Sequence, residues 1–329
     1  MRGERDTGIG KREEAGTSPF SLPPSPFTAF GPCSLSNLGP GFDALGVCIT
    51  GPGDRVTAEI TEAPGVTVAP TCGLPTDPDK NTAARAAAEV LRLGSATGGL
   101  RLRIEKGIPL GSGIGGSAAS AVAGAWAANE ALGRPFAKAE LVEAVLEGES
   151  ATGSRHGDNV LPTLFGGAVL VDAGDPTRYR RLQIPEGLRL AVLVPEVEVL
   201  THEARAVLPA TVPHRDAAAQ AAALAFLVDA LRAGDWETAG RTVMTDRLAE
   251  PFRAPLIPVY HEVRRAATEA GSLGCTLSGS GPALFAFPDA SGRAGPVLAA
   301  MEVACAEAGI GSLGWIAEID TEGVHTVPS

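Results

Sequence analysis

Blocks of alternating hydrophobic and polar residues begin at Phe27 and predict strands in the first part of the chain. RVTAEI (55–60) and VTVAP (66–70) repeat with a period of two residues, which is typical of half-buried strands. Pro64 and Gly65 lie between the two segments and favour a turn there. We therefore expect two strands joined by a turn.

Helical spacing interrupts the period of two at residues 81–94. Apolar residues there recur as they do on one face of a helix. We predict that this helix is capped by Asn81 or Asp79 and that it ends at Gly94. The period of two returns at 99–107, so a further strand is expected to follow.

A second and a third helix are predicted after a glycine-rich loop. The alanine-rich segment 117–133 is the second helix, and 138–150 is the third. A polar loop over 151–159 and a strand over 166–174 come next. The sequence then turns polar at 175–179, which we predict to be a domain boundary.

The second half of the chain again mixes strands and helices. We predict a buried strand over 188–196, mostly helix over 215–250, and a strand, tight glycine turn and strand over 275–287. A helix over about 294–309 and a last strand over 314–320 complete the pattern.

The whole pattern predicts an α+β fold in two domains, because strands and helices alternate without a strict β-α-β repeat. The domains are 26–175 and 176–329, preceded by a leader, 1–25, that we expect to be disordered. This leader mixes charge with proline and serine and lacks the apolar core of a secretion signal. No stretch approaches the run of about 18 apolar residues that a membrane span needs.

Charge and cysteine content exclude some classes of protein. The formal net charge of −11 argues against a chain built to neutralise nucleic-acid phosphates. The five cysteines are far apart and never form a C-x-x-C pair, so neither a disulfide framework nor a zinc site is indicated. They are Cys33, Cys48, Cys72, Cys275 and Cys305. A reducing cytoplasm fits this pattern best.

The glycine-rich loop GIPLGSGIGGSAAS (107–120) precedes the alanine-rich helix and is the strongest chemical signal. Its glycines fit G-x-G-x-x-G from Gly111, but Pro109 separates them from the strand, and the acid at the expected distance, Glu130, lies inside a helix. A dehydrogenase is therefore disfavoured. Ser117 stands where a Walker loop needs lysine, which excludes that loop too.

The interpretation that remains is that the loop binds an anion. A glycine-rich loop that leads into a helix presents free N–H groups and the positive end of the helix dipole to a ligand. A flexible connector is the alternative that this segment alone leaves open.

Further segments agree with a phosphate-binding loop. PLGSGIGGSAA (109–119) resembles the phosphate loop of the GHMP kinases, a superfamily that includes galactokinase, homoserine kinase, mevalonate kinase and phosphomevalonate kinase. The segment 34–46 resembles the opening motif of the homoserine kinases in particular. The match continues at 154–171 and 200–209, and 277–287 resembles the C-terminal glycine motif.

The resemblance covers about residues 27–320 and implies a fold, a reaction, its cofactor and its partners. It implies a ribosomal protein S5 domain 2-like N-terminal domain and a ferredoxin-like C-terminal domain. It also implies phosphoryl transfer from ATP, with Mg²⁺, to the side-chain hydroxyl of L-homoserine in threonine biosynthesis. A cytoplasmic homodimer without nucleic-acid or membrane partners is expected.

Two oxygen ligands for Mg²⁺ are implied on the nucleotide side. Ser117 matches the serine that helps to hold this hard cation, and Glu149 resembles the second ligand. Glu147 is an alternative nearby, and the interval from Glu149 to His156 is one residue shorter than in the family. Gly116 replaces a serine of the family, but its backbone N–H can still bind phosphate.

The loop residues implied to contact ATP form one continuous run, with Asn81 as a candidate beside the adenine. The run consists of Pro109, Leu110, Gly111, Ser112, Gly113, Ile114, Gly115, Gly116, Ser117, Ala118 and Ala119.

Homoserine is a zwitterion, so its site needs an anion, a cation clamp and groups that position the hydroxyl. The resemblance implies that Asp43 receives the ammonium and that Arg205 and Arg253 hold the carboxylate, a planar anion that suits guanidinium forks. The residues implied to line the amino acid are Asn37, Asp43, His156, Asn159, Thr201, Arg205 and Arg253.

Asn159, together with Ser117 and Glu149, is the implied catalytic group, because it would hold the hydroxyl in line with the γ-phosphate. His156 is assigned to substrate binding, since homoserine kinases are thought to need no dedicated base.

Alternatives remain open at this point. Asp43 could simply stabilise a turn, and Arg205 could be a solvent-facing residue of a helix. Arg253 could form an ion pair with Glu250. Mevalonate or shikimate is another conceivable acceptor, but both lack an ammonium for Asp43. A non-catalytic nucleotide-binding protein of the same fold is a third possibility.

Overall fold

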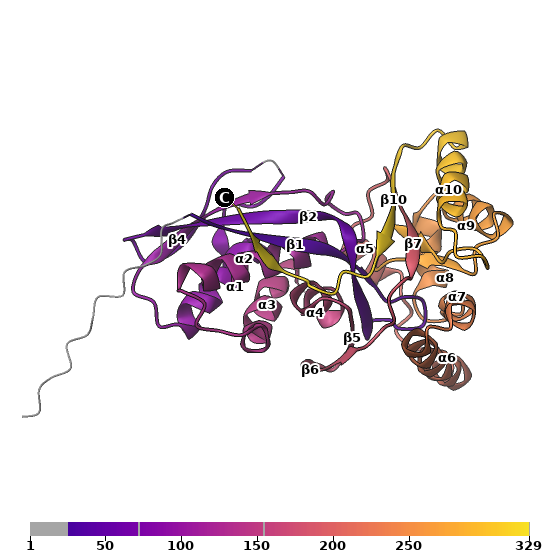
Figure 1. The fold of residues 1–329 in the computed structure, drawn as a ribbon, viewed down its shortest axis with the longest axis horizontal. Coiled ribbons are helices and arrows are strands. Elements are labelled where there is room, and N and C mark those ends of the chain that lie inside the picture. The colour runs from indigo at the N-terminus through magenta and orange to yellow at the C-terminus, as the bar shows by residue number, and fades with distance from the viewer. Residues whose placement is uncertain (1–25, 72, 154, 329) are drawn as a thin grey trace, which may run out of the picture.

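The computed structural model describes residues 26–71, 73–153 and 155–328. Over these ranges the chain forms two parts, each built around its own sheet, that lie side by side along the long axis of the molecule (Figure 1). The predicted leader, 1–25, lies outside the described residues. Within those ranges no helix is long and apolar enough to cross a bilayer.

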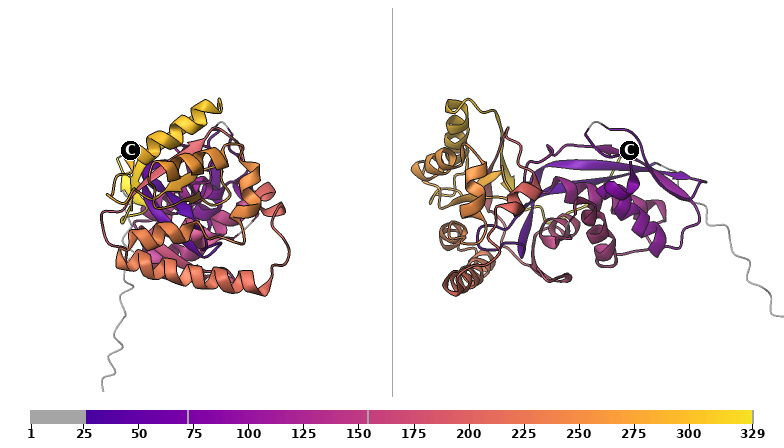
Figure 2. Two further views of the ribbon diagram at one scale, coloured as in Figure 1. Left: turned by 90° about the vertical axis from the view of Figure 1, so that its right-hand side faces the viewer. Right: turned by 180° about the vertical axis from the view of Figure 1, so that it is seen from behind.

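The first part is a sheet with helices packed on one face (Figures 1 and 2). In the described chain it has seven strands: β11-β1-β2-β4-β3 in order, with β5 pairing with β2 and β6 pairing with β5. The strands are β1 (Phe27–Ser36), β2 (Leu45–Thr61), β3 (Gly65–Val68), β4 (Gly99–Glu105), β5 (Ala168–Asp172), β6 (Asp175–Leu182) and β11 (His325–Val327). The helices are α1 (Thr82–Leu93), α2 (Gly116–Ala131), α3 (Val142–Glu149) and α4 (Gly157–Phe165).

The second part is a four-stranded sheet of order β10-β7-β9-β8 within the described residues. Its strands are β7 (Arg189–Pro195), β8 (Cys275–Leu277), β9 (Leu284–Ala286) and β10 (Ser312–Glu318). The helices are α5 (Thr201–Ala206), α6 (His214–Ala233), α7 (Trp236–Val243), α8 (Glu250–Arg253), α9 (Tyr260–Glu269) and α10 (Gly295–Glu307). Short 3-10 helices cover Pro78–Lys80, Lys138–Leu141, Ser150–Thr152 and Ala254–Leu256.

A shared hydrophobic cluster joins the two parts. It brings Leu35 and Ile49 from the first sheet against Val192 and Phe285 from the second, and Leu227 of α6 packs on the same cluster. Burial of these apolar side chains fixes one part against the other. Any site between the two sheets therefore has rigid walls.

Helix α2 is buried on nearly all sides, which explains its alanine-rich sequence. Small side chains allow α1 and the sheet to approach its backbone closely. One such close contact is at Gly124, where an added Cβ would collide with the backbone carbonyl oxygen of Ala83 in α1. This packing holds the start of α2, and with it the glycine-rich loop, in one position.

Several sequence predictions are confirmed in detail. Helix α1 is capped by Asn81, whose Oδ1 accepts a hydrogen bond of 3.1 Å from the N–H of Ala84, and it ends before Gly94. The segment 275–287 contains the predicted strand, glycine turn and strand. The mixed helices and sheets confirm the α+β class.

Other predictions are wrong or incomplete. Half of the predicted loop 151–159 is structured, because a 3-10 turn follows α3 and α4 begins at Gly157. Helix α4 starts with residues of poor helix propensity and forms because its apolar side chains are buried, so tertiary packing overrides propensity. The sequence patterns also did not predict α9, which is rich in charge.

The division into domains at residue 175 stays a prediction. Strand β6 begins at this residue and pairs with β5, and β11, near the end of the chain, pairs with β1. Apart from Asp175, the last residue of the first predicted domain, both strands belong by sequence to the second predicted domain and by pairing to the first sheet.

The packing of α1 against α2 generates a stability prediction. Gly124→Ala places a methyl group against the Ala83 carbonyl, so we expect the free energy of unfolding to fall by about 1–3 kcal/mol, as overpacked cores do. Chemical denaturation measures this change. Gly295→Ala is the matched control, because an added Cβ there meets no atom within 4 Å. Equal stability of both variants would contradict the close packing at Gly124.

Candidate functional site

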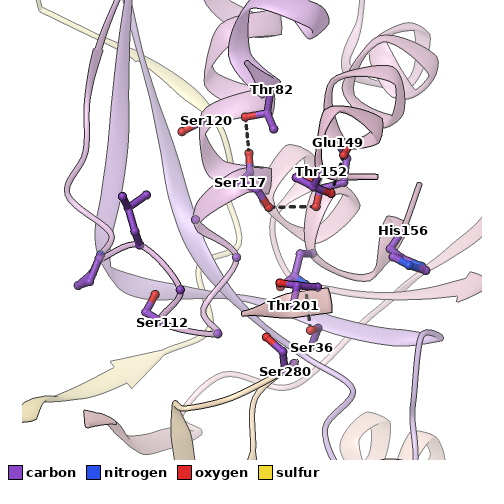
Figure 3. Close-up of a pocket in the computed structure, with 18 of the residues that line it drawn as sticks. Ser36, Thr82, Ser112, Ser117, Ser120, Glu149, Thr152, His156, Thr201 and Ser280 are labelled. Carbon is purple, nitrogen blue, oxygen red and sulfur yellow. Dashed lines mark hydrogen bonds between the residues drawn. The ribbon is translucent and has the colours of Figure 1, made fainter. Parts of the chain in front are cut away.

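One cavity of about 290 Å³ lies where the glycine-rich loop, the start of α2 and the end of α3 meet α5, α8 and the glycine turn after β8. Figure 3 shows Ser117 between Thr82 and Glu149, with Thr201 and Ser280 below it and His156 to the right. Both parts of the fold therefore contribute to the cavity.

The glycine-rich loop needs its glycines at three alternate positions. Gly111, Gly113 and Gly115 have φ angles of +65°, +78° and +73°, a backbone region that other residues rarely adopt. Gly115 is the N-cap of α2 and supplies no side chain to its first N–H groups. These N–H groups and the positive end of the helix dipole suit an anion.

A second glycine turn, after β8, holds this loop from the other side. A Cβ on Gly113 would lie 2.5 Å from the carbonyl oxygen of Gly281. Ser278 Oγ donates a hydrogen bond of 2.7 Å to the Gly113 carbonyl, and the N–H of Ala283 donates one of 3.1 Å to the Ser112 carbonyl. The glycine-rich loop (107–120) and the glycine motif at 277–287 are far apart in the sequence but contact each other in the fold.

Asp54 and Lys106 anchor the stem of the loop, and sequence reasoning missed both. The buried Asp54 carboxylate accepts hydrogen bonds from the N–H groups of Gly107 and Ile108, each at 3.2 Å, and from Ser120 Oγ at 2.6 Å. Lys106 Nζ also bonds to Asp54 and donates 2.8 Å to the Gly116 carbonyl. Lys106 lines the cavity, but Asp54 balances its charge, and its three N–H donors are taken by Asp54, the Gly116 carbonyl and Ser120 Oγ.

Ser117 and Glu149 form the oxygen pair expected of a cation site. Ser117 Oγ donates a hydrogen bond of 3.0 Å to Glu149 Oε1, while Glu149 Oε2 is buried and has no partner in the ranges that the structure describes. Burial raises the pKa of Glu149 to about 8, and the Ser117 hydrogen bond lowers it by less. The alternative carboxylate, Glu147, is instead paired with Arg85.

An unpartnered buried carboxylate oxygen beside a hydroxyl fits a hard cation such as Mg²⁺. Among the described residues no group of three or more His, Cys, Asp or Glu side chains could surround a metal ion. A cation here would therefore share its coordination with phosphate oxygens and water, as Mg²⁺ usually does at nucleotides.

Asp43 and Arg205 meet at the other end of the cavity. Arg205 Nη2 donates to Asp43 Oδ1 at 2.9 Å, and Arg205 Nη1 donates to Asp43 Oδ2 at 3.2 Å. His156 Nδ1 lies 4.0 Å from Asp43 Oδ2, and burial lowers the pKa of His156 although Asp43 opposes this effect. The neutral form of His156 is therefore favoured near pH 7.

Arg253 is buried beside this pair and is held by backbone carbonyls. Its Nε donates 3.1 Å to Ala204 and its Nη1 donates 2.8 Å to Gly279. The guanidinium carbons of Arg253 and Arg205 lie 5.1 Å and 5.7 Å from the centre of the Phe42 ring. Both guanidinium groups therefore lie within cation–π range of the Phe42 ring.

Asn37 shapes the loop that carries Asp43. It has a φ angle of +68°, its Oδ1 accepts 3.1 Å from the N–H of Asp43, and its Nδ2 donates 3.2 Å to the Gly279 carbonyl. Its position in the cavity wall agrees with the predicted site, but its amide already serves to hold the loop.

Asn159 is fixed from both sides by serines of β1. Ser34 Oγ donates 2.9 Å to Asn159 Oδ1, and Asn159 Nδ2 donates 2.9 Å to Ser36 Oγ. The neighbouring Asp158 also lines the cavity and is buried, yet sequence reasoning missed it. Burial raises the pKa of Asp158 to about 7, and the charge of Asp43 acts in the same direction. Its place directly before Asn159 was the available signal.

An apolar wall lies near the glycine-rich loop. It consists of Leu74, Pro75, Ile104, Pro109 and Leu110. Asn81 borders it, but its Oδ1 caps α1 and its Nδ2 donates 2.9 Å to the Pro75 carbonyl. The apolar wall can bind a flat aromatic ring, whereas the Asn81 amide already has hydrogen-bond partners within the protein.

The structure brings most of the predicted site residues to this cavity. They are Asn37, Asp43, Asn81, Pro109, Leu110, Gly111, Ser112, Gly113, Gly115, Gly116, Ser117, Glu149, His156, Asn159, Thr201, Arg205 and Arg253. Three predicted loop residues do not line it, because Ile114, Ala118 and Ala119 turn their side chains into the core. Their burial positions the loop from behind.

Comparisons with known proteins agree with this geometry. The model of the GHMP kinases N terminal domain matches residues 81–167, and that of the GHMP kinases C terminal domain matches residues 227–306. A homoserine kinase of Pyrococcus abyssi is 42% identical over 260 residues, covering 78% of this chain and 86% of that protein. A homoserine kinase of Chlorobium phaeovibrioides is 39% identical over 313 residues, covering 90% of this chain and 98% of that protein.

Solved structures show the same relationship. The crystal structure of a homoserine kinase from Cytophaga hutchinsonii superposes with a TM-score of 0.89 and 35% identity, over 94% of this chain and all of that one. A Lactococcus lactis galactokinase in complex with galactose has a TM-score of 0.68 at 15% identity, over 92% of this chain and 95% of that one, which shows the fold alone.

The raised pKa of Glu149 generates a prediction for the ligand-free protein. A carboxyl group whose folded pKa exceeds its ordinary value of 4.5 costs stability as pH rises from about 4.5 to about 8, because the unfolded chain loses this proton while the folded state keeps it. Above about 8 the folded state holds a buried charge, and the cost stays constant. Glu149→Gln removes this cost. We expect the melting temperature of the variant to exceed that of the unchanged protein at pH 9, and the difference to vanish near pH 4.

Thermal unfolding across this pH range, with and without Mg²⁺ and ATP, measures the effect. Glu147→Gln is the control, since Glu147 pairs with Arg85 outside the cavity and should not change the pH dependence in this way. Parallel pH curves for the unchanged protein and the Glu149 variant would contradict the buried charge.

Proposed function

This chain belongs to the GHMP kinases and, within them, to the homoserine kinases, and from that premise we propose how its residues transfer the γ-phosphoryl group of ATP to the side-chain hydroxyl of L-homoserine. The products are ADP and O-phospho-L-homoserine, an intermediate of threonine biosynthesis. One observation carries the proposal: an acid and two arginines lie in the same cavity as a phosphate-type loop.

The nucleotide would bind along the first part of the fold. We assign its phosphates to the N–H groups at the start of α2, since these supply the positive potential. The adenine would lie on the apolar wall that includes Leu74 and Pro109. Ser117 and Glu149 would hold Mg²⁺, which neutralises phosphate charge when it is bound.

Homoserine would bind by exchange with an existing ion pair. Asp43 and Arg205 neutralise one another in the structure, and a zwitterion offers each of them a new partner: ammonium for Asp43 and carboxylate for Arg205 and Arg253. Total charge in the site is then unchanged. Mevalonate and shikimate carry a carboxylate but no ammonium, so they would leave Asp43 facing an anion.

The remaining residues would position the hydroxyl and receive its proton. Phosphoryl transfer depends mainly on alignment and charge stabilisation. Asn159, held rigidly by Ser34 and Ser36, would orient the hydroxyl. Asp158 would accept the proton, because it is the neighbouring carboxyl in the cavity and its pKa lies near 7. His156 would contact the substrate in its neutral form.

Assembly and compartment belong to the same proposal. The family resemblance supports a homodimer. The described cysteines, Cys33, Cys48, Cys275 and Cys305, are all free and buried, which fits a reducing cytoplasm.

The role of Asp43 generates a prediction about selectivity. Asp43→Asn should raise the KM for L-homoserine by roughly tenfold to a hundredfold, as the loss of a charged contact does. The same variant should change the kinetics with 4-hydroxybutyrate, which lacks the ammonium, by much less. Steady-state assays with both acceptors measure this. An equal loss with both acceptors would show that Asp43 has only a structural role.

The role of Asp158 generates a prediction about pH. If its carboxylate accepts the proton, kcat rises with pH through about 7, and Asp158→Asn lowers kcat by roughly a hundredfold or more and removes this rise. Asp175→Asn, at an exposed site in β6, is the control. A variant with unchanged kcat and pH profile would show that transfer needs no base at this position.

A further inference from the structure

Helix α6 carries a polar residue, Gln220, on its buried face. The other buried residues of this helix are Leu227, Ala230 and Leu231, whereas Gln220 is an amide that is only 5% exposed. A buried amide has to find its hydrogen-bond partners within the protein, because leaving its polar groups unpaired is costly. The partners of Gln220 therefore show which segments it connects.

The Gln220 amide bonds to two separate segments of the chain. Its Nε2 donates 3.0 Å to the Pro40 carbonyl, in the loop between β1 and β2, and 2.8 Å to Asp246 Oδ1, in the segment before α8. Its Oε1 accepts a hydrogen bond of 2.9 Å from the N–H of Arg247. Both N–H donors and the oxygen of the amide are thus engaged. One side chain ties the loop to the segment that leads into α8.

Each of these two segments carries a charged group of the amino-acid site. In the loop, Asp43 follows three residues after the bonded carbonyl. In the other segment, the Asp246 carboxylate accepts a hydrogen bond of 2.7 Å from the N–H of Glu250, the first residue of α8, and Arg253 is the last residue of that helix. Gln220 is therefore a short distance along the chain from both the acid and the buried cation.

The loop between β1 and β2 needs support from outside, because its backbone is strained. Asn37 and Asp43 have φ angles of +68° and +54°, in the left-handed region that residues other than glycine rarely adopt. Gly39 lies directly against the end of α7, where an added Cβ would collide with the Val243 carbonyl. Glycine offers no side-chain bond at this contact, so the directional link on this side comes from Gln220.

A second connection joins the same two segments at the cavity. Asn37 Nδ2 donates 3.2 Å to the Gly279 carbonyl, and Arg253 Nη1 donates 2.8 Å to the same oxygen. Gly279 lines the cavity and Gln220 does not. One connection alone would let the loop and α8 pivot about it, whereas two connections at separate places fix how the loop and α8 lie relative to each other.

We propose that Gln220 is a positioning residue that sets the separation of Asp43 from Arg253 and thereby the affinity for a zwitterionic substrate. This role rests on the proposed function, since it concerns the homoserine end of the same site. Without the amide, the loop and α8 adopt other relative positions, and the apparent affinity falls with the fraction of molecules that keep the binding arrangement. The nucleotide binds at the other end of the cavity and is not affected.

Steady-state kinetics of Gln220→Leu tests the proposal. Leucine keeps most of the volume but makes none of the three hydrogen bonds. We expect the KM for L-homoserine to rise roughly fivefold to thirtyfold, with a much smaller change in kcat and an unchanged KM for ATP. Gln220→Glu is a second variant of nearly the same shape. Its carboxylate would face the Pro40 carbonyl and the Asp246 carboxylate, so the KM for L-homoserine should rise at least as much.

Two control variants separate positioning from a general loss of stability. Leu231→Ala opens a cavity on the same buried face, about three turns farther along α6, so it should lower the melting temperature without raising the KM for L-homoserine. Asp216→Asn removes an ion pair of 3.1 Å with Arg247, which links α6 to the segment before α8 but not to the loop. This exposed pair contributes little, so the KM should stay nearly the same.

The outcomes distinguish this role from the proposed function. An unchanged KM for L-homoserine in both Gln220 variants would overturn the positioning role. An equal rise in the KM values for L-homoserine and ATP, or the same selective rise in Leu231→Ala, would overturn it as well. Failure of the unchanged protein to phosphorylate L-homoserine would instead refute the proposed function, and the role of Gln220 with it.

Discussion

The contact between two glycine-containing segments holds the site together. Gly113 of the phosphate-type loop lies so close to Gly281 of the turn after β8 that a Cβ on Gly113 would collide with the Gly281 carbonyl, so a side chain there would displace the turn. Ser278 fixes the contact with a hydrogen bond to the Gly113 carbonyl. Because one segment carries the anion-binding N–H groups and the other borders Arg253, this contact sets the distance between the nucleotide and the amino acid. Precise alignment of this kind is what phosphoryl transfer requires of an enzyme.

The sequence predicted local features well and long-range partnerships poorly. The Asn81 cap, the Gly94 helix end and the glycine turn of 275–287 depend on neighbouring residues, and all were predicted. Asp54 was missed because its carboxylate is recognisable only once Lys106, more than fifty residues away in the chain, is folded against it. Family resemblance supplied the candidate site residues that periodicity could not.

Buried acids give the cavity its electrostatic character. Glu149 and Asp158 both have raised pKa values because burial disfavours their charged forms. Each lies where the proposed reaction brings a positive charge or a proton: Mg²⁺ for Glu149 and the released proton for Asp158. In the ligand-free site, ionisation of these two acids is costly because they are buried. A ligand that brings a positive charge or a proton lowers this cost, so the burial that raises the pKa values also contributes to ligand affinity.

The same reasoning explains why Arg253 is free to bind a carboxylate. Glu250 lies one turn away and is the obvious partner for it, but the buried Glu250 carboxylate instead accepts hydrogen bonds from Tyr260 and Thr276 and lies 3.7 Å from Arg264. Arg253 is left with carbonyl acceptors, which orient the guanidinium but do not neutralise it. A buried cation that is bonded only to carbonyl oxygens is costly. An anionic group that binds beside Arg253 offsets part of the cost of burying this cation. The free energy that is regained contributes to the affinity for the substrate.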